Sequence, residues 1–332
     1  MAYAAFRSIG AYIPPKIMTN ADFEKIIDTS DEWITKRTGI KERRIAEDDI
    51  NPSDMGAEAA KQAIERAGIN KEDIDLVVCA TVTPDYLCMP STACLIASKI
   101  DLPAVQAFDI SAACTGFVYA VSVAKAFIES GMKKNVLIVG AEKYTSILNY
   151  EDRGTCFIFG DGAGAAVISA SDNKDEAIID VNCSSDGNHE DLIKTPGGGS
   201  KNPCSQEVLD AKMACIHMKG NETFKHAVKT LTSDVEVMME KHNITNDDID
   251  HFIAHQANYR IISAVGKALK LSEEQTVVTV DKYGNTSAAS IPMAMNYAYE
   301  NGKIKDGDMI LFDAFGGGLT WGSALFPFAP NK

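Results

Sequence analysis

The chain has 332 residues, of which 45% are apolar and 23% are charged, and its formal net charge is −14. This length predicts two domains or one large core built of two halves, and the composition is that of a globular protein. The negative charge argues against a general nucleic-acid binder. No run approaches the roughly 18 apolar residues of a membrane-spanning helix, so we expect no membrane partner.

The chain has eight cysteines, at positions 79, 88, 94, 114, 156, 183, 204 and 215. None forms a Cys-x-x-Cys pair, and no set of cysteines and histidines has the spacing of a zinc site. The N-terminal residues lack the basic segment and apolar core of a signal peptide. We therefore expect a cytoplasmic protein with reduced thiols, no bound metal and no cofactor.

In chain order, residues 3–9 predict a strand and residues 53–67 an amphipathic helix that ends at Gly68. A strand led in by acidic turn residues is expected over 69–80, and a helix over 92–98. Helix N-caps are expected at Asn20 and Ser30.

Ser30 opens a short helix that Gly39 ends. Trp33 and Arg37 lie four residues apart and therefore share a face of this helix. The pair can be a plain surface cation–π contact, which the residues alone favour, or a flat platform for a nucleotide base.

Cys114 lies between two apolar segments. Residues 104–108 predict a buried strand, and residues 116–130, apolar nearly all round, predict a helix buried in a large protein. At a helix N-terminus the unpaired N–H groups and the dipole favour an anion, and a thiol there often has a lowered pKa. A buried cysteine is also a common apolar filler, so Cys114 alone does not establish a nucleophile.

A strand is expected over 135–140, and residues 153–167 predict two strands around a glycine-rich turn. Its Gly-x-Gly-x-Gly spacing superficially resembles a nucleotide-binding loop, but no helix follows to hold a phosphate. Close packing of strands is the favoured reason for these glycines. A charged break at 172–176 divides the chain into an N-terminal half, 1–174, and a C-terminal half, 175–332.

The second half contains a long turn-rich loop over 195–203, of a kind that is usually functional or disordered. Two helices are expected after it, over 221–241 and 258–270.

The two halves repeat one pattern. Residues 69–80 match 244–255, the segment from Asp109 matches the segment from Asp281, and residues 135–141 match 308–314. Three matches in the same order indicate a duplicated unit of alternating strands and helices, hence parallel sheets covered by helices.

The duplication also predicts a site. It pairs Cys114 with Asn285, and it places His255 at the end of the strand that matches the one ending at Ala80. Polar residues at strand ends and strand-to-helix turns are where α/β proteins build their sites.

A set of motifs then identifies a family. The chain resembles β-ketoacyl-[acyl-carrier-protein] synthase III, the initiating condensing enzyme of bacterial type II fatty-acid synthesis and a member of the thiolase superfamily. The resemblance implies a thiolase-like α/β fold whose two duplicated halves pack as an αβαβα layered sandwich. The motifs that support this resemblance are Asp31-Glu-Trp33, Arg37-Thr38-Gly39, Ala113-Cys114-Thr-Gly116, Asp152-Arg153-Gly-Thr155, Phe159-Gly-Asp-Gly-Ala-Gly164, His255-Gln-Ala-Asn258, Gly284-Asn285-Thr-Ser and Phe315-Gly-Gly-Gly318.

The resemblance implies an acyltransferase. Cys114 would take an acyl group from acetyl-CoA as a thioester, and His255 and Asn285 would stabilise the enolate formed when malonyl-acyl carrier protein loses CO2. The backbone N–H groups of Cys114 and Gly317 would form an oxyanion hole. A thiolate attacks thioesters well, and His and Asn both supply N–H donors to developing negative charge. The products would be acetoacetyl-carrier protein, CO2 and CoA.

The resemblance also implies the binding residues of a homodimer. Contacts to coenzyme A would come from Trp33, Arg37, Thr38, Arg153, Asn221, Ala257 and Asn258, with Phe224 near the site. Carrier-protein contacts would come from Gln256, Arg260 and Lys267. Because both proteins are acidic, docking needs a local basic patch, which we expect from Arg260, Lys267, Lys270, Lys219 and Lys225; a solvated helix face is the equally weighted alternative. Met89, where many relatives have Phe, would reach the acyl pocket of the partner subunit.

Three alternatives remain open from the sequence. One is a related synthase that uses a larger acyl-CoA primer or serves secondary metabolism. Another is a Cys/His thioesterase, which would not need Asn285. The third is a non-catalytic partner subunit, although such subunits usually lack the nucleophile.

Overall fold

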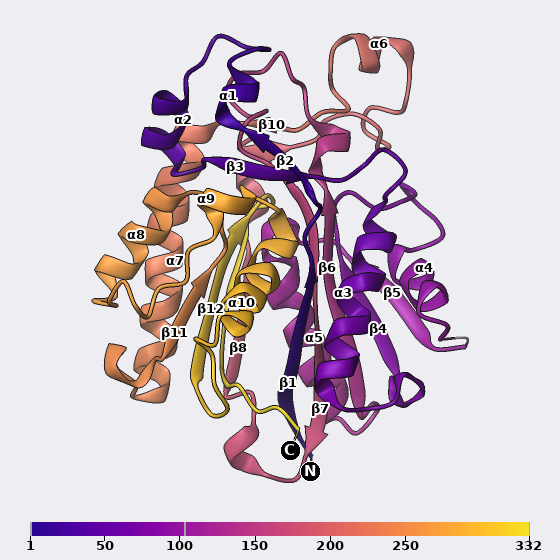
Figure 1. Ribbon diagram of the computed structural model, residues 1–332, viewed down its shortest axis with the longest axis vertical. Helices are drawn as coiled ribbons and strands as arrows, with labels where there is room; N and C mark the ends of the chain where they lie inside the picture. Colours follow the sequence, from indigo (N-terminus) through magenta and orange to yellow (C-terminus); the bar gives the residue numbers. More distant parts are fainter. Residues whose placement is uncertain (1, 103, 332) are drawn as a thin grey trace.

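The computed structural model describes residues 2–102 and 104–331. Two large β-sheets lie face to face with helices between and outside them (Figure 1). The first sheet has the strand order β1-β7-β6-β4-β5 and the second has the order β11-β12-β13-β8. In the figure the first sheet is built from the indigo-to-magenta part of the chain and the second is mainly yellow and orange.

The strands of the first sheet are β1 (Tyr3–Tyr12), β4 (Leu76–Ala80), β5 (Gln106–Ile110), β6 (Asn135–Lys143) and β7 (Asp161–Ser171). Those of the second are β8 (Asp180–Ser185), β11 (His251–Ala254), β12 (Met309–Gly316) and β13 (Thr320–Pro327). In each sheet a parallel core pairs with antiparallel strands: β4 is parallel to β5 and β6, and β11 is parallel to β12.

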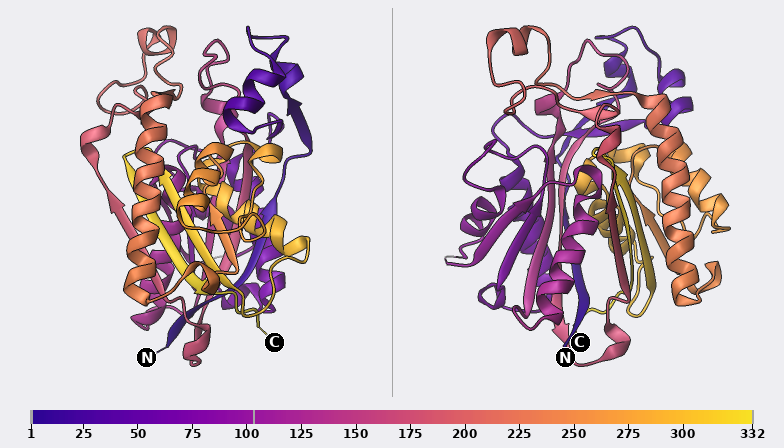
Figure 2. Two further views of the ribbon diagram at one scale, coloured as in Figure 1. Left: turned by 90° about the vertical axis from the view of Figure 1, so that its left-hand side faces the viewer. Right: turned by 180° about the vertical axis from the view of Figure 1, so that it is seen from behind.

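The helices form three layers. Outside the first sheet lie α3 (Pro52–Ala67) and α4 (Thr92–Lys99), and outside the second lie α7 (Gly220–His242) and α8 (Tyr259–Ala268). Between the sheets lie α5 (Gly116–Glu129) and α10 (Ser290–Glu300), as the back view in Figure 2 shows. This αβαβα sandwich confirms the predicted fold class.

Two segments lie at one end of the sandwich, at the top of Figure 1. The 16–45 segment contains β2 (Lys16–Thr19), α1 (Asn20–Phe23), α2 (Asp31–Thr38) and β3 (Glu42–Ile45). The 186–219 segment contains β9 (Ile193–Lys194), α6 (Gln206–Asp210) and β10 (His217–Met218). A short helix, α9 (Val280–Tyr283), contacts β3 from the second half.

Both halves place a central helix next to a sheet with parallel and antiparallel strands, and the structure changes one part of the predicted register. A 3-10 turn precedes each central helix: η2 (Ala113–Thr115) before α5 and η7 (Ser287–Ala289) before α10. The first residue of each turn, Ala113 or Ser287, has a positive φ, of 46° and 50°. The equivalent of Cys114 is therefore Ala288 and not Asn285, because the sequence match slipped by three residues within a polar turn.

Local sequence explains most helix ends. The helix α3 begins with Pro52 after an Asn51–Asp54 capping box, and Gly68 ends it in the left-handed conformation. Ser30 caps α2 by accepting a hydrogen bond from the backbone N–H of Trp33. The cap of α1 is Thr19 and not the predicted Asn20, whose side chain instead binds inside the 16–45 segment.

Two predicted strands differ from the structure. Residues 153–160 form turns, and a single strand, β7, contains the glycines from Gly162 onward. The strand β5 lies at the edge of its sheet, so its residues are half-buried where a buried strand was expected. In both places the outcome depends on pairing partners far away in the sequence.

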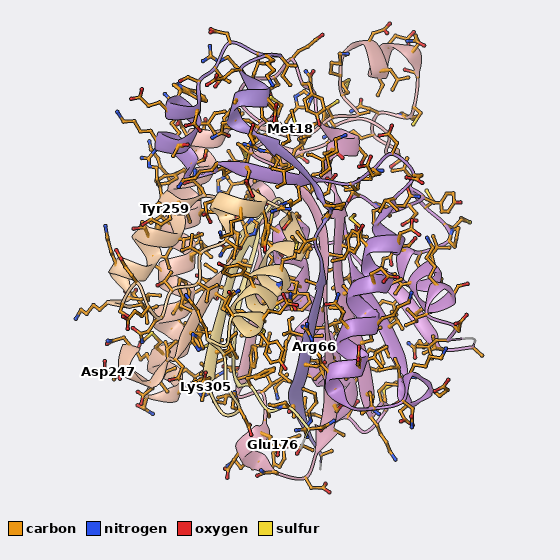
Figure 3. All side chains as sticks on the ribbon, viewed as in Figure 1. Met18, Arg66, Glu176, Asp247, Tyr259 and Lys305 are labelled. Carbon is orange, nitrogen blue, oxygen red and sulfur yellow. The ribbon has the colours of Figure 1, made fainter. Side chains whose placement is uncertain are left out.

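Side chains fill the spaces between layers and leave charged groups on the outside (Figure 3). One apolar cluster lies between the sheets around Phe117, Phe312 and Phe326. A second lies between the second sheet and α7 and α8, and it extends to Ile34 and Phe157 near the 16–45 segment. These clusters fix the strand ends at which the predicted site residues lie.

Candidate active site

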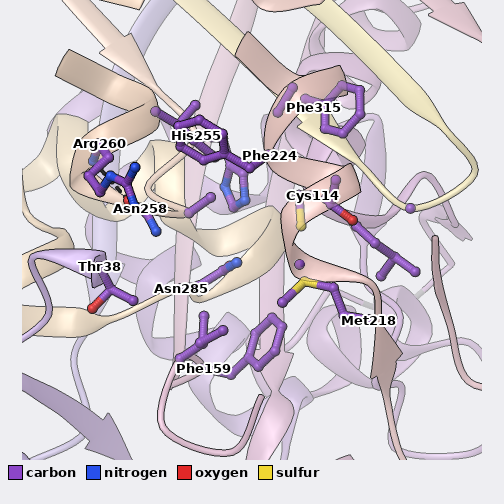
Figure 4. Close-up of a pocket in the computed structure, with 18 of the residues that line it drawn as sticks. Thr38, Cys114, Phe159, Met218, Phe224, His255, Asn258, Arg260, Asn285 and Phe315 are labelled. Atoms are coloured by element: carbon purple, nitrogen blue, oxygen red, sulfur yellow. Dashed lines mark hydrogen bonds between the residues drawn. The ribbon is translucent and has the colours of Figure 1, made fainter. Parts of the chain in front are cut away.

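A cavity of about 600 Å³ opens at the end of the sandwich where the 16–45 and 186–219 segments lie. Both halves contribute to its wall, as do both segments. Cys114, His255 and Asn285 all line it, and Figure 4 shows their side chains directed toward a common space. The structure therefore brings together the three residues that the sequence predicted as catalytic.

The nucleophile candidate Cys114 lies in η2, one turn before α5. The end of β12 passes so close that a Cβ on Gly316 would lie 2.7 Å from the backbone nitrogen of Cys114. Only glycine allows this approach. The close contact holds the Gly-Gly-Gly segment against the backbone of Cys114, and Gly317 lines the cavity beside it.

Burial raises the pKa of the Cys114 thiol to about 12, with an added increase from the Glu142 carboxylate and an opposing hydrogen bond from Ser287. The predicted lowering of this pKa by the helix N-terminus is therefore wrong for the free protein, because loss of water around the sulfur outweighs it. The resting side chain is a protonated thiol at neutral pH.

His255 follows β11 and is 4% exposed. Burial lowers its pKa to about 3, so the imidazole is neutral at physiological pH. Its Nδ1 lies 2.6 Å from the Ser290 hydroxyl oxygen, which also accepts a hydrogen bond from the backbone N–H of Gln256. We assign the Ser290 proton to the bond with Nδ1, an assignment that leaves Nε2–H as a donor to the cavity.

Asn285 lies in the turn before η7. Its Oδ1 accepts a hydrogen bond of 2.8 Å from the backbone N–H of Ser287, so its amide NH2 group is left to donate. The backbone of Asn285 pairs with that of Ile158 and Gly160 in the first half. Two neutral N–H donors, from His255 and Asn285, thus face one cavity.

Trp33 in α2 packs edge-to-face on Phe157 at 5.4 Å between ring centroids. The Arg37 guanidinium lies 4.5 Å from the Trp33 ring centroid, and that of Arg153 lies 5.3 Å from it. A flat ring between Trp33 and Arg153 needs about 7 Å, two van der Waals contacts. Arg153, which also pairs with the exposed Asp28 at 3.1 Å, must therefore move before any base stacks there.

The other predicted coenzyme A contacts lie together at the mouth. Asn258 caps α8 and donates a 3.1 Å hydrogen bond to the backbone oxygen of Arg37, which joins α8 to α2. The cavity lining includes Trp33, Arg37, Thr38, Asn221, Phe224, Ala257 and Asn258, but not Arg153.

Two residues of the predicted basic patch, Arg260 and Lys225, line the cavity, whereas Lys219, Lys267 and Lys270 are not among its lining residues. Arg260 is exposed and stacks its guanidinium 5.1 Å from the ring centroid of Phe224. Lys267 and Lys270 are exposed near the end of α8, whereas Lys219 is paired with Asp191.

Gln256 is not part of this surface. It is 1% exposed, and its amide binds the backbone of Ala254, Val277, Thr279 and Val280. The prediction that Gln256 contacts a carrier protein is therefore wrong: its amide joins β11 to the segment before α9.

Comparison with known proteins identifies the family. The family model 3-Oxoacyl-[acyl-carrier-protein (ACP)] synthase III matches residues 108–187, and the model of its C-terminal part matches 239–328. The chain is 81% identical over its full length to the full-length Beta-ketoacyl-[acyl-carrier-protein] synthase III of Aliarcobacter butzleri. It is 67% identical over 98% of its length to the Sulfurovum sp. protein of that name, of which 96% is covered.

The chain belongs to the β-ketoacyl-[acyl-carrier-protein] synthase III family. The crystal structure of 3-oxoacyl-[acyl-carrier-protein] synthase III from Aquifex aeolicus matches 98% of the chain with 44% identity and a TM-score of 0.90, and all of that structure is covered. The chain is thus an acyltransferase of thiolase-like fold, the initiating condensing enzyme of fatty-acid synthesis.

In this synthase III, Met89 does not line the cavity of its own chain. It is 78% exposed, and its neighbours Tyr86 and Leu87 are 56% and 75% exposed. The three side chains form an apolar loop tip outside the first sheet. A primer-pocket role for Met89 therefore requires a second chain.

Sequence reasoning missed several cavity residues. Tyr144 lines the cavity, and so do Ile193, Ile216 and Met218 from the 186–219 segment. Burial raises the pKa of the Tyr144 phenol well above its usual value, and the nearby Cys114 and Glu142 raise it further. The sequence signal for this segment was the long turn-rich loop over 195–203, which did not indicate which residues contact the cavity.

Glu142, at the end of β6, is a buried carboxylate beside the site. It accepts hydrogen bonds from the hydroxyls of Thr81 and Thr83 and from the backbone N–H groups of Val82 and Thr83. Burial raises its pKa to about 7. These bonds fix the turn after β4 against the strand that leads to Tyr144.

The described residues contain neither a metal-binding cluster nor a membrane-spanning helix. No cluster of three or more His, Cys, Asp or Glu side chains there could hold a metal ion. Within residues 2–102 and 104–331, no helix is both long enough and apolar enough to cross a membrane.

Proposed function

We propose that this synthase III transfers an acetyl group from acetyl-CoA to Cys114 and condenses it with malonyl-acyl carrier protein. The products are acetoacetyl-carrier protein, CO2 and CoA. The convergence of Cys114, His255 and Asn285 on one cavity carries this proposal. The name shared by the relatives, which includes the acyl carrier protein, supports it.

In the first half-reaction the Cys114 sulfur attacks the thioester carbonyl. The new C–S bond forms as the bond to the coenzyme A sulfur breaks. The thiol proton of Cys114 ends on the departing coenzyme A thiol, so the step needs no net proton acceptor. The backbone N–H groups of Cys114 and Gly317 would bind the oxyanion that forms between the two steps.

In the second half-reaction malonyl-carrier protein loses CO2. The electron pair of the broken C–C bond forms an enolate at the thioester oxygen, which the neutral His255 and Asn285 stabilise with their N–H groups. The enolate carbon attacks the acyl carbonyl on Cys114 and expels the sulfur, which regains a proton. Neither His255 nor Asn285 has to act as a base in the decarboxylation.

Coenzyme A would enter past α2 and α8. Trp33 offers the face for the adenine, and Arg153 closes over it after leaving its present position and the exposed Asp28. Asn221, Ala257 and Asn258 line the path from this platform toward Cys114, where the pantetheine arm would lie.

We also propose a homodimer built on the open edge of the first sheet. The edge strand β5 leaves Phe108 and Ile110 half-buried, and the apolar loop tip at Met89 lies in the connection from β4 to α4. Unpaired sheet edges readily pair with another strand. The eight unpaired cysteines are consistent with action in the reducing cytoplasm.

The test is a condensation assay with labelled acetyl-CoA and malonyl-carrier protein. We expect labelled acetoacetyl-carrier protein, and mass spectrometry of the intermediate should show an acetyl group on Cys114. Cys114→Ala should abolish labelling of the protein. A Cys156→Ala variant serves as the matched control, because Cys156 lies outside the cavity lining and should be dispensable.

The possible outcomes separate the alternatives. Free acetate without acetoacetyl product would indicate a hydrolase and overturn the proposal. Labelling that survives Cys114→Ala and disappears in Cys156→Ala would assign the nucleophile to Cys156. No labelling of the wild-type protein would indicate a non-catalytic subunit.

A further inference from the structure

One wall of the cavity is aromatic and rigid. The rings of Tyr144 and Phe159 are stacked, with centroids 4.5 Å apart and planes 12° apart, and each residue is 3% exposed. Both line the cavity that contains Cys114. Leu148 and Ile216 pack around the pair in a small apolar cluster.

Hydrogen bonds of neighbouring residues fix the backbone on which each ring is carried. Next to Tyr144, the Thr145 backbone N–H and hydroxyl donate to the fully buried Asp161, at 3.0 and 2.7 Å. Around Phe159, the backbone N–H of Gly160 donates to the Asn285 oxygen, and that of Asn285 donates to the Ile158 oxygen. The wall and the catalytic asparagine thus share one frame and cannot move independently.

Aliphatic side chains lie beside the aromatic pair. Ile193 and Ile216, from the 186–219 segment, pack in its apolar cluster, and Met218 of the same segment also lines the cavity. Aliphatic side chains adapt to a ligand more easily than stacked rings do. In Figure 4 the Phe159 ring and the Met218 side chain lie on the same side of Cys114, away from Arg260 at the mouth. An acyl chain on the Cys114 sulfur therefore extends toward the aromatic pair.

We propose that the Tyr144–Phe159 pair restricts the primer of this enzyme to short acyl groups, with Tyr144 as the residue that determines length. This inference rests on the proposed function and adds the specificity of the same site. Stacking on Phe159 and packing against Leu148 and Ile216 hold the Tyr144 ring in place.

The experiment measures acylation of Cys114 by acyl-CoAs of two, four, six and eight carbons, using mass spectrometry of the intact protein. In Tyr144→Leu and Tyr144→Ala, the rate with hexanoyl-CoA relative to acetyl-CoA should rise about ten-fold or more over wild type. Tyr144→Phe keeps the ring and should stay within about two-fold. Tyr299→Leu removes a tyrosine that packs edge-to-face on Phe328 and does not line the cavity, so it should also leave the ratio within about two-fold of wild type.

Tyr144→Met is a further variant in case Tyr144→Leu or Tyr144→Ala fails to fold, because methionine fills irregular cores without strain. It should also raise the hexanoyl-to-acetyl ratio, with its fold checked by the melting temperature. An unchanged ratio in folded Tyr144→Leu and Tyr144→Met would overturn the inference, as would an equal shift in Tyr144→Phe.

Failure of the proposed function gives a different result. If that function is wrong, wild-type Cys114 forms no acyl-enzyme with any of the four thioesters. If only the inference is wrong, wild type acylates normally and the Tyr144 variants keep its chain-length profile.

Discussion

The Ser290 hydroxyl lies 2.6 Å from His255 Nδ1 and accepts a hydrogen bond from the backbone N–H of Gln256. When this hydroxyl donates to Nδ1, the imidazole proton is on Nε2. Without this bond, proton and lone pair could exchange between the two ring nitrogens. Ser290 is thus a positioning residue: it acts through His255 and does not line the cavity.

Ser290→Ala should lower the rate of malonyl decarboxylation about ten-fold, a fraction of the roughly 100-fold or more that a lost donor costs. Acetylation of Cys114 should remain near wild type, because it does not use the His255 donor. Separate single-turnover assays of the two half-reactions measure this difference. Ser130→Ala, at the exposed end of α5, is the control. Equal losses in both half-reactions would indicate a merely structural role.

For single residues, the sequence predicted which side chains take part in the reaction better than it predicted the surroundings of those side chains. Cys114, His255 and Asn285 were found because their motifs are specific, and their convergence followed from the duplicated halves. The pKa of Cys114 was predicted in the wrong direction because burial depends on neighbours such as Glu142 and Tyr144 that no local pattern reveals. Gln256 was misplaced for the same reason.

The helix α8 joins the coenzyme A path to the basic surface. Its cap, Asn258, binds the backbone of Arg37 in α2, while Arg260, two residues on, reaches over Phe224 of α7. The protein has a formal net charge of −14, so an acidic partner needs a local positive region to dock.

Arg260→Glu should raise the KM for malonyl-carrier protein about ten-fold or more, because like charges at a docking surface oppose binding. The KM for acetyl-CoA should change little. Steady-state assays with each substrate varied in turn measure both values, and raised salt should reduce the difference. Lys303→Glu, an equal charge reversal beyond α10, is the control. An unchanged KM for the carrier would exclude this docking surface.

Elements with their own start and stop signals were predictable. The helix α3 has a capping box and a terminal glycine, and α5, α7 and α8 have strong apolar faces, so their predicted ends lie within two residues of those observed. Residues 153–160 were predicted as a strand because Phe157, Ile158 and Phe159 are apolar. They are buried by α2, α9 and the 186–219 segment, contacts that sequence patterns do not encode.

The stability of the whole molecule depends on carboxyl groups whose ionisation is disfavoured by burial. Asp313 of β12 is fully buried, and neither of its oxygens has a hydrogen-bond partner among the described residues. Burial raises its pKa well above the usual value, and the nearby Asp234 raises it further. Asp234, bound by Ser323 at 2.6 Å, also has a pKa raised by burial.

A raised carboxyl pKa destabilises the fold as pH increases. Above the unfolded pKa of about 4, the unfolded chain releases the Asp313 proton while the folded protein keeps it, so the free energy of unfolding falls with pH. Asp313→Asn should therefore gain stability over wild type, and the gain should be larger at pH 8 than at pH 4. Urea unfolding at both values measures it, with exposed Asp306→Asn as the control. A gain that does not change with pH would contradict the expected ionisation.

The two equivalent positions, Cys114 and Ala288, have different surroundings, so the two halves are not symmetric at the site. A Cβ on Gly116 would lie 3.3 Å from the Ala288 methyl group, and one on Gly140 would lie 2.4 Å from the Ala288 backbone oxygen. The turn η7 lies against both η2 and β6, and these close contacts leave little room for a side chain larger than the Ala288 methyl group. Each chain therefore carries one nucleophilic turn, and the equivalent turn of the other half is a packing element.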